Sequence, residues 1–175
     1  YYINDFSSEL YGLYRAIADQ DKHFFKYMHA MDKSWCELLS FCQKHTDLID
    51  AYHAYRKGQS DEDVLRMHIQ SFLNMHDREL IEILPENSLR DKTQFIAELR
   101  DNIPRKLLRM RALEMTHGDM PDGDIIDNIE TAFMGGLYFY YRGLYNHPEI
   151  KQRNAGLATA LFVFIRNYAY SSMFR

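Results

Sequence analysis

Residues 21–44 read DKHFFKYMHAMDKSWCELLSFCQK. Apolar side chains recur in this stretch every three or four residues, which is the spacing of one face of an α-helix. They are Phe24, Met28, Met31, Trp35, Leu38, Leu39 and Cys42. The stretch therefore predicts a long amphipathic helix, whose apolar face must be buried against other parts of the chain.

The same helical spacing continues on both sides of this stretch, and Gly, Ser and Pro residues mark the ends of the segments. The predicted helices cover about residues 8–17, 21–44, 47–57, 61–73, 88–113, 125–140 and 155–165. Pro104 marks a kink or a new start within the fifth of these, and residues 117–124 form the clearest loop. Only residues 1–5 favour a strand. We therefore expect a mainly α fold with one N-terminal strand.

The composition indicates one folded, soluble unit. The chain has 175 residues, of which 46% are hydrophobic and 26% are charged, as in a globular domain with a sizeable core. No apolar run approaches the roughly 20 residues of a membrane-spanning helix, and the first residues show no signal-peptide pattern. We therefore expect a cytoplasmic protein with no membrane partner. Cys36 and Cys42 lie on different faces of one predicted helix, so we expect both to be reduced core residues.

Charge is distributed unevenly along the chain. The formal net charge of −4 excludes a protein that holds nucleic acid by bulk electrostatics alone. Residues 142–175, however, carry five basic side chains and one acidic side chain. A second basic stretch contains Arg100, Arg105, Lys106, Arg109 and Arg111, with only Asp101 as a local acid. Arg105, Lys106 and Arg109 are therefore candidate phosphate contacts. The alternative is a solvated helix face.

Most motifs that would identify an enzyme are absent from the sequence. It contains no glycine-rich phosphate loop, no Ser-centred nucleophile elbow and no His-Glu-x-x-His zinc helix. The eight histidines show no ligand spacing with one another or with the cysteines, so the sequence predicts no metal site. His53 and His68 are expected to be surface or partly buried helix residues without a metal-binding role.

Two segments at the ends of the chain have residue types suited to ligand binding. Asp5 follows the predicted strand, where a carboxylate can accept hydrogen bonds from a ribose diol, and Phe6 could pack on an adenine. The alternative is that Asp5 only caps the helix that follows. Residues 161–175, LFVFIRNYAYSSMFR, predict an apolar helix that ends in aromatic residues interleaved with Arg, Asn and Ser. This mixture suits a nucleic-acid surface, and the alternative is a buried helix end.

Together, and in this order, the two segments resemble the N6-adenine-specific DNA methyltransferases of the DNA adenine methyltransferase (Dam-like) type. That family carries an Asp-x-Asn-x-x-Leu-x-x-x-Tyr segment after its second strand, matched here by Asp5, Leu10 and Tyr14, with Ser7 in place of the frequent Asn. It also carries an apolar helix running into an aromatic, Arg-rich turn like residues 167–175, which lies against the target DNA. The resemblance implies that the N-terminal strand belongs to a Rossmann-like α/β methyltransferase sheet.

The resemblance also implies roles for individual residues. Asp5 and Phe6 would bind S-adenosylmethionine, the methyl donor. The residues expected to contact double-stranded DNA near the displaced adenine are Arg166, Asn167, Tyr170, Met173 and Arg175. The family's glycine-rich cofactor loop and its Asp-Pro-Pro-Tyr motif do not occur in these 175 residues, so we predict no catalytic residue here and expect this piece alone to be inactive. Some enzymes of this type act together with a restriction endonuclease, which would be a further partner.

The resulting hypothesis is a piece of a site-specific DNA adenine methyltransferase that mainly serves target recognition. Residues 1–20 would belong to the methyltransferase core, residues 21–154 would form a helical insert or target-recognition region, and residues 155–175 would form the apolar helix leading into a DNA-facing turn. The apolar, aromatic ends of the sequence favour a fragment of a longer protein over a complete small one. The alternative function is a non-enzymatic, all-helical DNA-binding or protein-docking module.

Overall fold

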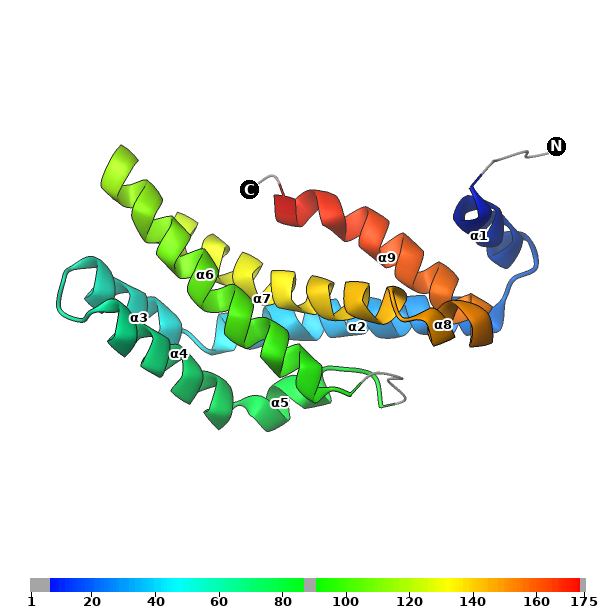
Figure 1. The fold of residues 1–175 in the computed structure, drawn as a ribbon, viewed down its shortest axis with the longest axis horizontal. Helices are drawn as coiled ribbons and strands as arrows, with labels where there is room; N and C mark the ends of the chain where they lie inside the picture. The colour runs from blue at the N-terminus through cyan, green and yellow to red at the C-terminus, as the bar shows by residue number, and fades with distance from the viewer. Residues whose placement is uncertain (1–6, 87–90, 174–175) are drawn as a thin grey trace.

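The computed structural model describes residues 7–86 and 91–173, and all of their side chains except those of residues 151–153 and 169–173 (Figure 1). Within these ranges every regular element is an α-helix, which confirms the mainly α prediction. The helices are α1 (Ser8–Ala18), α2 (Lys22–Lys44), α3 (Asp47–Arg56), α4 (Glu62–Met75), α5 (Asp77–Glu82), α6 (Thr93–His117), α7 (Asp122–Tyr145), α8 (Pro148–Arg153) and α9 (Ala155–Met173). The predicted N-terminal strand lies outside the described residues, so the strand and its link to a methyltransferase sheet stay predictions.

The longer helices form one packed body. α2 and α7 lie side by side along the long axis of the molecule, and α9 packs against both (Figure 1). α6 crosses α7 and also packs on α4, which forms a helical hairpin with α3. α1 and α8 contact α9. The buried apolar side chains make one hydrophobic core, and the large ones that are fully buried include Leu38, Tyr52, Phe95, Phe133, Tyr140 and Phe164.

Two adjacent glycines set the close approach of α6 to α7. A Cβ atom on Gly136 would lie 2.5 Å from Leu99 Cδ2, and one on Gly135 would lie 2.6 Å from Asn102 Nδ2. Real Cβ atoms do not come so close to other heavy atoms, because interiors are already densely packed. The missing side chains therefore let α6 lie directly against the backbone of α7, which brings the polar residues of the two helices together.

Capping residues explain where several helices begin and end. Ser7, Asp21 and Asp61 each accept a hydrogen bond from a backbone N–H in the first turn of α1, α2 and α4. Gly118 follows the last residue of α6 with a φ of 94°, a conformation that favours glycine. The predicted loop at residues 117–124 is confirmed in its position, although it is shorter than expected because α7 begins at Asp122.

Two details of the predicted helices are wrong, and one alternative is excluded. Of the kink or new start expected at Pro104, the new start is excluded, because α6 runs through the proline with the buried Ile103 and Leu107 on either side of it. α9 continues to Met173, through the residues where we expected a turn, since no Gly or Pro follows Gly156 to end it. α5 and α8 were not expected, because six residues are too few to show a helical period.

The cysteine prediction is half right. Cys42 is buried in the core, whereas Cys36 is exposed on the outer side of α2, and neither forms a disulfide bond. Six residues are 600° of helical rotation, which places the two thiols on clearly different faces. In the part of the chain that the structure describes, no helix combines the length and the apolar character that crossing a membrane requires.

Candidate nucleic-acid interface

A pocket of about 430 Å³ lies between α6 and α7. Its lining consists of Asn102, Arg105, Lys106, Arg109, Thr131, Gly135, Tyr138, Phe139 and Arg142. Four of these residues are cationic, two are aromatic and none is acidic. Low-dielectric walls that carry charge of one sign concentrate the field inside a cleft. The pocket is therefore suited to a phosphate or another anion.

The four cations of the lining come from two helices. Arg105 and Arg109 are exposed and lie one turn apart on α6, while Arg142 is exposed in the last turn of α7. None of the four forms an ion pair with any acid among the described residues. Burial, followed by the charges of Arg109 and Arg105, holds the pKa of Lys106 below its ordinary value. A bound anion would relieve the repulsion that Lys106 experiences from Arg109 and Arg105.

Arg105 is held in place by neighbouring groups. Its Nη2 atom donates a 2.6 Å hydrogen bond to Asn102 Oδ1, and Asn102 Nδ2 donates one of the same length to the carbonyl oxygen of Ala132 on α7. The guanidinium carbon lies 5.7 Å from the centre of the Phe139 ring, within cation–π distance. The side chain is thus oriented before any ligand binds, which lowers the entropy cost of binding.

The structure brings the three predicted phosphate contacts into one pocket and adds residues that sequence reasoning missed. Arg142, Tyr138 and Phe139 complete the lining from α7. The sequence indicated Arg142 only through its place in the basic region 142–175. No local pattern connects it with Arg105 and Arg109, which lie more than 30 positions earlier. Only the antiparallel packing of α6 and α7 brings the two sets together.

The residues predicted to contact DNA near the C-terminus lie apart from this pocket, on α9. Arg166 and Asn167 are exposed. Between them and the end of the helix, Tyr168 stacks on Trp35 of α2 with 3.9 Å between ring centroids. That contact and the buried Leu161 and Phe164 turn one face of α9 inward, and Arg166 and Asn167 face solvent.

Other predicted site residues fall where the structure gives no side chain. Tyr170 and Met173 belong to α9, but their side chains are outside the described set. Asp5, Phe6 and Arg175 lie outside the described residues altogether. The predicted roles of these five residues stay predictions.

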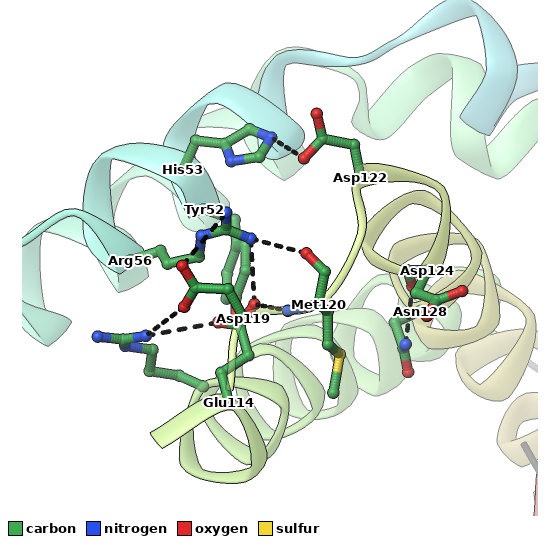
Figure 2. A network of polar contacts seen from close by, with 10 residues as sticks. Tyr52, His53, Arg56, Glu114, Asp119, Met120, Asp122, Asp124 and Asn128 are labelled. Atoms are coloured by element: carbon green, nitrogen blue, oxygen red, sulfur yellow. Dashed lines mark hydrogen bonds and ion pairs between the residues drawn. The ribbon is translucent and has the colours of Figure 1, made fainter. Parts of the chain in front are cut away.

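A buried carboxylate supports the end of α6 beyond the pocket (Figure 2). Glu114 accepts hydrogen bonds from Tyr52 of α3 at 2.7 Å, from Arg56 Nη1 at 3.2 Å and from the backbone N–H of Met120 at 3.0 Å. Burial opposes its ionisation, but these donors and the charge of Arg111 outweigh it, so the pKa of Glu114 is held below its ordinary value. The carboxylate is fully buried and both of its oxygens accept hydrogen bonds, which favours a structural role.

A second polar cluster contains the residues best suited to hold a metal. One ligand atom from each of His45, His76 and Glu79 lies within 4.8 Å of the other two. Lys44 donates a 2.9 Å hydrogen bond to Glu79, and this bond is the main cause of the lowered pKa of that carboxyl group. Sequence reasoning missed the cluster because the two histidines are 31 positions apart and lie at the ends of different helices.

Comparisons of the chain with protein-family models, with curated proteins and with solved structures gave no match.

Proposed function

We propose that this chain binds DNA through the α6–α7 pocket, as the target-recognition part of an S-adenosylmethionine-dependent DNA adenine methyltransferase. The observation that carries the DNA contact is a lining of four cations and two aromatic rings without an acid. Arginine and lysine bind backbone phosphates, and aromatic rings pack against sugars and bases. In this arrangement the cations would hold one strand of the duplex and Tyr138 or Phe139 would contact the adjoining nucleotide.

The methyltransferase part of the proposal is supported by the residues at the two ends of the chain. Asp5 and Phe6 would bind the cofactor, and the exposed Arg166 and Asn167 would join Tyr170, Met173 and Arg175 in contacts to DNA. A base-modifying enzyme must displace the target base from the duplex, which costs a few kcal/mol of stacking and pairing. Firm contacts to the backbone beside the target help to offset this cost, and the α6–α7 pocket is suited to that task.

A second candidate is a non-enzymatic helical module that binds DNA or a partner protein. It is favoured by the fact that the described residues form helices only, without a strand of a methyltransferase sheet. A DNA-binding module of this kind would share the pocket but have no cofactor. Methyl transfer, rather than DNA affinity, therefore separates the two candidates.

The DNA contact is tested by fluorescence anisotropy with a labelled duplex over a range of salt concentrations. Replacing Lys106, Arg109 and Arg142 together with Gln should weaken binding roughly tenfold or more and reduce the salt slope by about 0.9 for each phosphate that the variant no longer neutralises. Lys57→Gln changes an exposed lysine at the end of α3 and should bind like the unaltered chain. Equal binding by the triple variant and the unaltered chain would overturn the proposal.

Catalysis is tested with the full-length protein on unmethylated duplex DNA. Transfer of the methyl group to adenine is expected, and Asp5→Ala should then weaken S-adenosylmethionine binding by about 1 to 3 kcal/mol, because the variant cannot accept hydrogen bonds from the ribose. A protein that binds DNA but neither binds the cofactor nor transfers a methyl group would leave the non-enzymatic module as the explanation.

A further inference from the structure

Two helix ends meet at the cluster of His45, His76 and Glu79. His45 is the C-cap of α2, and His76 is both the C-cap of α4 and the residue that precedes α5. Glu79 lies in the first turn of α5. The rings of Phe41 and Phe72 pack edge to face beneath the cluster, and each also contacts a histidine ring. The three polar side chains are therefore held at the ends of packed helices.

The distances within the cluster match the ligand shell of a small divalent metal. His45 Nε2 lies 3.3 Å from Glu79 Oε2, and His76 Nδ1 lies 3.6 Å from the same oxygen. Zinc binds imidazole nitrogen and carboxylate oxygen at roughly 2.0–2.2 Å in a tetrahedron, which places neighbouring ligand atoms about 3.3–3.5 Å apart. Only small side-chain adjustments would be needed to bring all three ligand atoms within bonding distance of one ion.

Hydrogen bonding satisfies this cluster poorly. His45 Nε2 is buried, and its 3.3 Å contact with Glu79 Oε2 lacks the geometry of a good hydrogen bond. An unsatisfied buried polar atom is costly to a folded protein. A metal ion would bind the lone pair of this nitrogen and remove that penalty. A role in capping the helix end would leave the nitrogen unsatisfied.

The surrounding charge has favourable and unfavourable parts. His45 and His76 are the C-caps of α2 and α4, and the C-terminus of a helix favours a cation, whereas the N-terminus of the short α5 opposes one. Lys44 also opposes a cation, but its side chain is exposed and its ammonium donates a hydrogen bond to Oε1 of Glu79. The other oxygen, Oε2, is the one that faces the two histidines.

We propose that His45, His76 and Glu79 form a binding site for a Zn²⁺-like divalent transition metal. Two imidazoles and one carboxylate select metals of this class over Mg²⁺ and Ca²⁺, which prefer oxygen ligands. Water would supply the remaining ligand. The ion would cross-link the end of α2 to the junction of α4 and α5, so that its binding stabilises the fold. This site is independent of the proposed DNA contact.

The site is tested with the whole chain after removal of metal by a chelator. Titration with Zn²⁺ should give one bound ion per chain, and Co²⁺ should give the visible absorption of a low-coordinate site. Zn²⁺ at about 100 times its Kd should raise Tm by roughly 5–10 °C. Glu79→Gln, which changes a half-exposed side chain and keeps its shape, should lower affinity more than about tenfold. His45→Ala should do the same.

Two controls separate this site from other metal-binding groups. His68→Ala removes an exposed histidine on α4, and Cys36→Ser removes the exposed thiol on α2. Both variants should bind Zn²⁺ like the unaltered chain. The absence of Zn²⁺ binding by the unaltered chain would overturn the proposal. So would equal Zn²⁺ affinity of the Glu79→Gln variant, provided that its circular dichroism matches that of the unaltered chain.

Discussion

Tyr52 on α3 donates a 2.7 Å hydrogen bond to Glu114 on α6, although the two residues are 62 positions apart in the sequence. Both side chains are shielded from solvent. The second carboxylate oxygen accepts hydrogen bonds from Arg56 and from the backbone N–H of Met120 (Figure 2). One carboxylate thus connects α3, α6 and the loop that leads into α7.

Glu114→Gln should lower the free energy of unfolding by about 1–3 kcal/mol. The amide keeps the shape of the side chain and can still accept a hydrogen bond from Tyr52, but it leaves Arg56 and Arg111 without their buried counter-charge. The side chains of Arg56 and Arg111 are 17% and 27% exposed, so water still solvates part of each charge. The loss of unfolding free energy is therefore smaller than for a fully buried ion pair. Urea denaturation of the two chains measures the difference.

Asp119→Asn is the matched control for this carboxylate. Asp119 lies at the rim of the same network, 3.8 Å from Arg56, but 67% of its side chain is exposed. An ion pair in that setting contributes little, so the free energy of unfolding should change by less than about 0.5 kcal/mol. A loss in Asp119→Asn as large as that in Glu114→Gln would contradict the dominant role of burial.

The stability that Glu114 provides should disappear at acid pH. Its pKa in the folded chain lies below the ordinary value of 4.5 that the unfolded chain has. The unfolded state therefore binds the proton first, so the contribution is complete above about pH 4.5 and is lost as the pH falls through the folded pKa. The unfolding free energies of the unaltered chain and Glu114→Gln should differ by a constant amount from neutral pH down to about pH 5, and converge below pH 4.5.

Long amphipathic segments made most of the fold predictable. The repeat of apolar residues in residues 21–44 predicts α2 to within one residue of its observed start at Lys22, because a helix of this length shows its period many times. The short α5 and the unbroken course of α6 through Pro104 were not predictable in this way. Both depend on packing between segments, which no local pattern contains.

The candidate sites were predictable only where their residues lie close together in the sequence. Arg105, Lys106 and Arg109 share one turn of α6 and were identified as phosphate contacts, whereas Arg142 was not connected with them. His45 and His76 escaped notice for the same reason, since metal-ligand motifs are recognised by short spacings. Buried polar pairs such as Tyr52 and Glu114 have no sequence signal beyond their residue types.

Gly136→Ala should destabilise the chain by about 1–3 kcal/mol, as overpacking does in a dense core. The new methyl group would lie 2.5 Å from Leu99 Cδ2, and because Leu99 is fully buried its side chain would have to shift within a densely packed core. Gly123→Ala is the matched control, because that glycine also lies in α7 but has no atom within 4 Å of a built Cβ. It should be neutral or stabilising by up to about 1 kcal/mol. Thermal unfolding of both variants provides the test.

The two thiols should react at very different rates with an aromatic disulfide reagent. Cys36 is exposed and should react at once in the folded chain, whereas Cys42 is buried and burial raises the pKa of its thiol, so the reactive thiolate is scarce. One equivalent of the aromatic thiolate should be released from the reagent before unfolding, and a second after denaturant is added. Cys36→Ser should remove the fast equivalent only. Fast release of two equivalents from the folded chain would contradict the burial of Cys42.

Tyr168→Ala should shift the fluorescence of Trp35, the chain's one tryptophan, to longer wavelength and increase its quenching by acrylamide. The two rings are stacked with 3.9 Å between centroids, so loss of the tyrosine ring admits water to the indole. Arg166→Ala, one turn or less away on the exposed side of α9, should leave the fluorescence unchanged and weaken binding to duplex DNA. The pair of variants separates two roles of the helix, since Tyr168 orients α9 while Arg166 is a proposed contact. Unchanged DNA affinity in Arg166→Ala would confine the proposed DNA contact to the α6–α7 pocket, and unchanged fluorescence in Tyr168→Ala would refute the stacking that orients α9.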